Sequence, residues 1–231
     1  MHAHGNEMDE PRVIRWDAFT AAWSPDGRLV ATGGKDRQAA IWDAAGREVK
    51  RLKGHSHIVH CVAWSPDGRL LASAGEDQLV KVWDVITWRE IGEIRKLRPD
   101  SPSFRGHSGN LCWSPASDRL ASGSLDGALI VWDVASGEEV LRTHGHSSSL
   151  TCTAWSPDGR RLASGSQDRT VKIWDALSGE ELLTLCGHVV KVNEVAWSPD
   201  GRRLASTDFS SVNAVKIWDA PGYERSPVER R

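Results

Sequence analysis

Serine, histidine and aspartate recur together along this chain of 231 residues, and these three side chains form the machinery of serine hydrolases. In each of three sets, Asp follows Ser by four residues and Trp follows Asp by six residues. A catalytic triad is needed once, so a constellation that is copied together with a tryptophan indicates a scaffold. We therefore expect no hydrolase site, and for the same reason no metal site in the repeated histidines. The sets are His55, Ser73, Asp77 and Trp83; His107, Ser122, Asp126 and Trp132; and His146, Ser164, Asp168 and Trp174.

The elements that must position these side chains are repeated units. Trp-Ser-Pro occurs five times, at intervals of 41, 49, 42 and 42 residues, and an aliphatic-Trp-Asp string follows each copy. A fixed period of this length predicts a propeller or a solenoid. Short apolar runs separated by Ser-Pro-Asp-Gly and Ser-Gly turns predict four short strands per unit. One such sheet cannot bury both of its faces, whereas sheets stacked radially cover one another.

With these repeated strings and this spacing, the sequence resembles the WD40 repeat family. Gly-His pairs precede four of the units, at Gly54, Gly106, Gly145 and Gly187, and Trp-Asp follows at the family's distance. The resemblance implies an all-β propeller of four-stranded antiparallel blades, built from five repeats and incompletely closed if the ends do not meet. It also implies a non-catalytic interaction platform. The expected organisation is a disordered tail (1–12), a propeller (13–220, with repeats of about 13–53, 54–105, 106–144, 145–186 and 187–220) and a C-terminal tail (221–231).

In this family a His, a Ser or Thr, an Asp and the Trp form a buried hydrogen-bond network, so the resemblance gives the recurring sets a structural role. The first repeat lacks the Gly-His pair, but Thr32, Asp36 and Trp42 keep the spacing, and this repeat is expected to be a terminal unit. The fifth repeat contains His188, Ser206 and Trp218. Its turn is two residues longer and Asp208 misses the usual offset, so the sequence leaves the network there open.

The resemblance also implies a partner-binding face at one end of the propeller. The positions lie six and four residues before each Trp of Trp-Ser-Pro, and just before the tight-turn Asp. Apolar residues among them would be anchors for a partner. Carried over, the positions are Asp17, Phe19, Lys35, Ile58, His60, Glu76, Gly109, Leu125, Ser149, Thr151, Gln167, Lys191 and Asn193.

The composition limits the classes of partner and the cellular compartment that we expect. A formal net charge of −2 gives no basic excess, so we expect neither nucleic acid nor a membrane surface as partner. The start of the chain has no apolar signal region, and the four cysteines form no C-x-x-C pair. Cys61 and Cys152 are expected to be buried in strands, and the protein is expected to be cytoplasmic, without a cofactor.

Closure of the ring is the main open point in the sequence. Propellers of this family usually have seven blades, and neither end of this chain reads as a good closing strand. Three alternatives stay open: a strained five-blade ring, an open arc that pairs with another copy, and part of a longer propeller. The third repeat has additional residues at about 95–105, which form either a solvated loop or a contact loop. In the turn of the same repeat, Ser117 replaces the glycine, which predicts a left-handed conformation there.

Three classes of function remain. The first is a scaffold that binds a protein or peptide through one propeller face. The second is a regulatory or sensor module, or a fragment of a larger signalling protein. A remote third is a glycosidase-like propeller enzyme, for which Asp17 and Glu76 are the carboxylates near the expected face.

Overall fold

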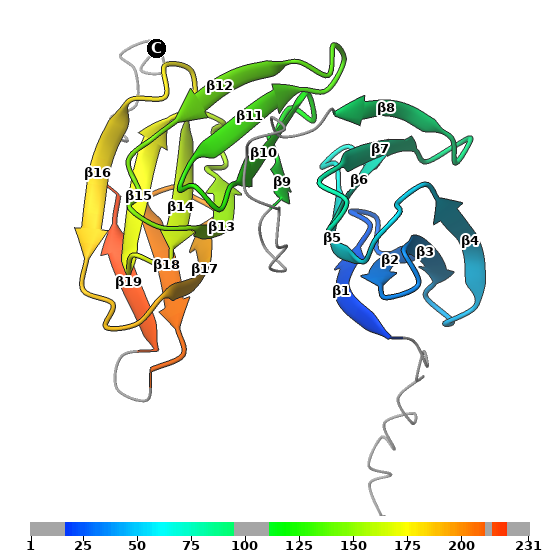
Figure 1. Cartoon of the computed structure of the whole chain (residues 1–231), viewed down its shortest axis with the longest axis horizontal. Helices are drawn as coiled ribbons and strands as arrows, with labels where there is room; N and C mark the ends of the chain where they lie inside the picture. The colour runs from blue at the N-terminus through cyan, green and yellow to red at the C-terminus, as the bar shows by residue number, and fades with distance from the viewer. Residues whose placement is uncertain (1–16, 95–110, 211–213, 221–231) are drawn as a thin grey trace, which may run out of the picture.

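The computed structural model describes residues 17–94, 111–210 and 214–220, and all regular secondary structure in these ranges is β-strand. The strands form five antiparallel sheets that follow one another along the chain (Figure 1). This confirms the expected all-β fold of propeller blades. The expected tails at 1–12 and 221–231, the surplus at 95–105, His107 and Gly109 lie outside the described residues.

The strands of each sheet are adjacent in the order in which the chain makes them. The first sheet contains β1 (Ala18–Trp23), β2 (Leu29–Gly34), β3 (Gln38–Asp43) and β4 (Glu48–Lys53). The second contains β5 (Val59–Trp64), β6 (Leu70–Gly75), β7 (Val80–Asp84) and β8 (Glu90–Ile94). The third contains β9 (Leu111–Trp113), β10 (Arg119–Gly123), β11 (Leu129–Asp133) and β12 (Glu139–Thr143).

The last two sheets differ in strand number. The fourth sheet contains β13 (Leu150–Trp155), β14 (Arg161–Ser166), β15 (Thr170–Asp175) and β16 (Glu181–Cys186). The fifth contains β17 (Val192–Trp197), β18 (Arg203–Asp208) and β19 (Val215–Asp219). Within the described ranges the fifth sheet therefore has three strands, and the outer edge of β19 has no strand beside it.

The Ser-Pro-Asp-Gly turn joins the first two strands of a sheet by local hydrogen bonds. In the fourth sheet, Ser156 Oγ donates to Asp158 Oδ1 at 2.5 Å and accepts the backbone N–H of Arg161 at 2.9 Å. Gly159 closes the turn with a φ of 70°, a conformation that glycine adopts without a steric cost. The same residues in the first, second and fifth units make the same turn, so the repeated string specifies a hairpin.

The third sheet makes this turn without glycine. Ser117 has a φ of 62°, which confirms the left-handed conformation expected there. Asp118 accepts the Ser114 hydroxyl at 2.7 Å, and so replaces the turn aspartate from a position two residues further along than the aspartate of the other turns.

Apolar cores lie between consecutive sheets. Because successive side chains of a strand point to opposite faces, each sheet that lies between two others contributes to two cores. On β7, Val82 packs towards the third sheet and Trp83 towards the first. The cysteines follow this pattern: Cys61 and Cys152 are buried in their strands, as expected, and all four cysteines are free thiols.

In the second, third and fifth sheets, the tryptophan of Trp-Ser-Pro bonds to the backbone of the sheet before it. The indole N–H of Trp64 donates to the Ala22 carbonyl at 3.0 Å, and that of Trp113 donates to the Ala63 carbonyl at 2.9 Å. Trp197 donates to the carbonyl of Ala154 at 3.2 Å. The repeated tryptophan therefore fixes the spacing of neighbouring sheets as well as filling the core.

The five sheets form an open arc (Figure 1). The outward faces of the first and fifth sheets are exposed: Trp23 is 60% exposed, and Val215 and Ile217 are 64% and 61% exposed. A closed five-blade ring would bury these side chains. The structure thus shows incompletely closed blades. In the described part of the chain, no helix has the length and apolarity to cross a bilayer.

Leucine-to-alanine changes at a core and a surface position test this packing. Leu162 is fully buried between the third and fourth sheets, whereas Leu177 is 81% exposed. Leu162→Ala is expected to lower the free energy of unfolding by about 2–5 kcal/mol, because it leaves a cavity. Leu177→Ala is expected to change it by less than about 0.5 kcal/mol. Urea denaturation measures both, and similar losses in the two variants would contradict the assignment of the core.

Candidate functional site

The second and fourth sheets contain the geometry of a hydrolase triad in a place that no substrate reaches. His146 Nδ1 lies 2.8 Å from Asp168 Oδ2, and its Nε2 lies 2.8 Å from Ser164 Oγ. Ser164 is fully buried and also accepts the indole N–H of Trp174 at 2.7 Å. The hydroxyl is therefore inaccessible and fully bonded, which suits a structural network. His55, Ser73, Asp77 and Trp83 form the same arrangement.

The fifth sheet completes the same network with an aspartate that the spacing rule missed. His188 Nδ1 lies 2.7 Å from Asp208 Oδ2, and its Nε2 lies 2.7 Å from Ser206 Oγ. Trp218 donates to Ser206 at 2.8 Å. Asp208 stands two residues after Ser206 rather than four, and it is the only aspartate between Ser206 and Trp218. That uniqueness is the signal that could have identified it.

The networks of the first and third sheets are reduced. In the first, Trp42 donates to Thr32 Oγ1 at 2.8 Å, and Asp36 instead accepts the Gln38 backbone N–H and lies 3.4 Å from Arg51.

In the third sheet, the expected bond from Trp132 to Ser122 is not made. Ser122 Oγ is buried without a partner in the described part of the chain. Asp126 is exposed and accepts the backbone N–H of Ala128. The expectation of a complete third network is thus wrong for these residues, in the repeat whose first strand is shortened.

Electrostatics fix the protonation of the network in the fourth sheet. Burial raises the pKa of Asp168, but hydrogen bonds from the Thr170 side chain and backbone and from His146 outweigh it and lower the pKa to about 2. Burial lowers the pKa of His146, although the carboxylate of Asp168 opposes this. A neutral His146 then donates from Nδ1 to the carboxylate and accepts the Ser164 hydroxyl at Nε2. Every polar atom of this network has a partner.

Five of the residues expected to bind a partner form one surface cluster across the first two sheets, in which all but the half-buried His60 are exposed. The Phe19 ring lies 5.3 Å from the His60 ring, and Lys35 Nζ lies 5.8 Å from the Phe19 centroid. Lys35 Nζ lies 4.0 Å from Asp17, and His60 Nε2 lies 2.8 Å from Glu76. Phe19 is 47% exposed. We call these residues, Asp17, Phe19, Lys35, His60 and Glu76, the Phe19 cluster.

The other residues expected at the partner-binding face differ in how deeply they are buried. Gln167 is exposed, and Ile58, Leu125, Lys191 and Asn193 are half-buried. Ser149 and Thr151 are buried and therefore do not belong to an accessible face, which corrects the expectation for them. The reason is packing against the next sheet: Thr151 Oγ1 donates to the Val192 carbonyl at 2.7 Å.

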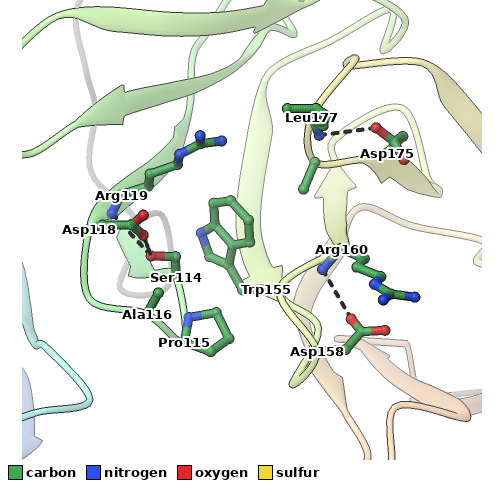
Figure 2. A pocket seen from close by; sticks show the side chains of 12 residues that line it. Ser114, Pro115, Ala116, Asp118, Arg119, Trp155, Asp158, Arg160, Asp175 and Leu177 are labelled. Carbon is green, nitrogen blue, oxygen red and sulfur yellow. Dashed lines mark hydrogen bonds between the residues drawn. The ribbon is translucent and has the colours of Figure 1, made fainter. Parts of the chain in front are cut away.

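A pocket of about 570 Å³ lies at the opposite end, between the third and fourth sheets (Figure 2). Sequence reasoning did not identify it. Trp155 stands in it between the two Ser-Pro turns, and its buried indole N–H has no partner in the described residues. Asp158 and Asp175 accept backbone N–H groups of their own turns, so these carboxylates shape the wall. Nothing in this lining selects a ligand.

No group of three or more His, Cys, Asp or Glu side chains in the described ranges is arranged to hold a metal ion. The residues of the Phe19 cluster instead offer an aromatic ring, a cation and carboxylates side by side on an exposed surface. Such a surface can bind a partner by packing and charge without any bond being made or broken.

Comparisons with known proteins agree with this architecture. The family described as the WDR19 first beta-propeller matches residues 19–186, and the family described as WD domain, G-beta repeat, matches residues 179–219. A U3 snoRNP-associated protein-like YAO from Arabidopsis thaliana is 40% identical over 65 residues, 27% of this chain. A probable serine/threonine-protein kinase PkwA from Thermomonospora curvata is 41% identical over 57 residues, 23% of this chain. The matches span only 13% and 8% of these two relatives.

The network predicts a stability difference between a framework and a surface position. Asp168→Ala is expected to lower the free energy of unfolding by about 1–3 kcal/mol, because it leaves buried donors unpaired. Lys191→Ala, at a half-buried surface position, is expected to stay within about 0.5 kcal/mol of wild type. Chemical denaturation measures both values, and equal losses would show that the division into framework and surface is wrong.

The lowered pKa of Asp168 predicts how this contribution depends on pH. The group is depressed from an ordinary value of 3.8 to about 2 in the fold, so its stabilisation is complete above about pH 4 and is lost as pH falls towards 2. The penalty of Asp168→Asn relative to wild type is therefore expected to be larger at pH 6 than at pH 2.5. Urea unfolding at the two pH values checks this, and a penalty that grows at pH 2.5 would contradict it.

Proposed function

Because this chain belongs to the WD40-repeat β-propeller family, we propose that it is a non-catalytic scaffold that binds a protein or peptide through the end of the arc carrying the Phe19 cluster. WD40 propellers generally bind protein partners. The observation that carries the proposal is the exposed Phe19 ring in contact with His60 and close to Lys35. These residues come from the first and second sheets and stand at positions where the resemblance to the family implies a binding face.

The chemistry of the cluster indicates the kind of segment it accepts. Phe19 offers an apolar face, and an aromatic anchor surrounded by polar groups is typical of residues that dominate binding energy. Lys35 is paired loosely with Asp17, at 4.0 Å, and both side chains are mostly exposed. Glu76 holds His60 in place at 2.8 Å. An extended peptide with an apolar side chain beside an acidic one fits this surface. Its acidic group would replace Asp17 as the ion-pair partner of Lys35.

A scaffold explains the carboxylates near this face better than a glycosidase does. Members of the family are generally non-catalytic. Asp17 and Glu76 each lie within ion-pair distance of a basic side chain, so neither is placed as an unpartnered acid or nucleophile. We also propose a reducing compartment such as the cytoplasm, which the four free thiols support. A hydrolase screen with any reproducible activity would count against the scaffold.

A regulatory or targeting module is a second candidate, favoured by the lengths of the relatives. Similar repeats occupy a small share of a protein named as snoRNP-associated and of another named as a probable protein kinase. In such a module the binding face would be the same, and an effector would adjoin it. Mass spectrometry of the intact protein from its native source distinguishes the two candidates by whether further domains are attached.

Phe19→Ala is expected to weaken binding of peptides selected on the wild-type protein from a random peptide library by at least tenfold, about 1.4 kcal/mol. The physical reason is loss of the exposed anchor ring. Fluorescence polarisation with labelled selected peptides measures the dissociation constants.

Ile86→Ala is the matched control, because Ile86 is 86% exposed in the turn at the other end of the second sheet. It is expected to bind the peptides as tightly as wild type. Equal weakening in both variants, unchanged binding in Phe19→Ala, or a library that yields no binding peptide would each overturn the proposed face.

A further inference from the structure

The two ends of the arc expose faces that are buried everywhere else. On the fifth sheet, Val215 and Ile217 are 64% and 61% exposed, whereas their equivalents on the fourth sheet, Val171 and Ile173, are 0% and 2% exposed. On the first sheet Trp23 is 60% exposed, whereas the equivalent Trp64 on the second sheet is 8% exposed. Apolar side chains grouped in this way are rare on a free surface and mark a contact site.

The exposed groups are the two halves of one repeated contact. At three of the four internal junctions, the Trp of Trp-Ser-Pro donates its indole N–H to the residue before the equivalent Trp of the preceding sheet: Trp64 donates to Ala22, Trp113 to Ala63 and Trp197 to Ala154. Trp23 is the donor that faces away from the first sheet. Ala196 stands at the equivalent acceptor position of the fifth sheet and is exposed. One end therefore supplies the donor and the other the acceptor.

The sizes of the side chains also match the two ends to each other. At the junction of the first and second sheets and at that of the fourth and fifth sheets, a glycine faces a valine: a Cβ added to Gly33 or Gly165 would lie 2.6 Å from a methyl group of Val59 or Val192. At the two middle junctions, Ala74 takes the glycine position of the second sheet and Leu150 takes the valine position of the fourth sheet. At the ends both residues differ. Thr207 takes the glycine position on the fifth sheet, by its pairing with Glu194.

Ala18 takes the valine position on the first sheet, by its pairing with Gly34. A threonine in place of the glycine needs a smaller residue opposite, and alanine in place of valine provides that room. In the geometry of the two glycine–valine junctions, a sheet with valine at this position would leave no room for the Thr207 side chain. Because the fifth sheet carries a larger residue and the first sheet a smaller one at the facing positions, the side-chain sizes favour the first sheet of a second copy as the partner of the fifth sheet.

We propose that the outward face of the fifth sheet of one copy binds the outward face of the first sheet of a second copy, in the manner of consecutive blades. The contact is heterologous, since different surfaces meet, so copies can add head to tail. It buries Trp23 of one copy against Val215 and Ile217 of the other. The partner is a second copy of this chain, and the geometry lies outside the Phe19 cluster.

Complementing variants test this arrangement. Trp23→Asp disables the first-sheet face and Ile217→Asp disables the fifth-sheet face, and both positions are exposed, so the fold is expected to persist. Size-exclusion chromatography with light scattering is expected to show wild-type mass rising with concentration. Each variant alone is expected to stay at the chain mass of 25.4 kDa.

An equal mixture of the two variants leaves one intact face on each chain. It is expected to form a single 1:1 complex of twice the chain mass, and no larger species, whereas Leu177→Asp is expected to associate as wild type does. A wild type that stays monomeric at every concentration would overturn the proposal, because the ends would then close on themselves or require another protein. A mixture that stays monomeric, or single variants that still form dimers, would also overturn it. Circular dichroism confirms that each variant is folded.

Discussion

Each four-stranded sheet of this protein has two apolar faces, and it can bury them only against other sheets. The rest of the structure follows from this constraint. Tryptophans of the Trp-Ser-Pro turns cross from one sheet to the next and bond to its backbone, so they set the spacing at which the apolar faces meet. The same constraint explains the exposed ends, because an array of five sheets leaves one face uncovered at each side.

Repetition separates the parts of the molecule that hold the fold from the parts that vary. The buried His–Ser–Asp–Trp networks join the strands of a sheet and leave no accessible hydroxyl, which removes the chemistry that their residue types suggest. At the end of the sheets opposite the Trp-Ser-Pro turns, the residues differ from unit to unit. The Phe19 cluster arises there because neighbouring units place an aromatic ring, an imidazole and a lysine within reach of one another.

Local patterns in the sequence predicted most of the fold, because the turns and strands depend on residues close in the chain. The left-handed Ser117 and the networks of the second and fourth sheets could be identified in this way. The spacing shared by the other repeats missed Asp208, because a longer turn returns the carboxylate to His188 from a different spacing. The burial of Thr151 depends on the following sheet, and the open arc depends on how all the sheets stack.

Hydrogen exchange of backbone amides, followed by mass spectrometry on dilute protein, tests most directly whether stacking between sheets holds the structure. Protection is expected to form a gradient along the arc. Amides of β1 and of β17–β19 should exchange fastest, and those of the second, third and fourth sheets slowest, since only these are covered on both faces. Equal protection of the first, middle and fifth sheets would contradict the open arc and indicate a closed ring.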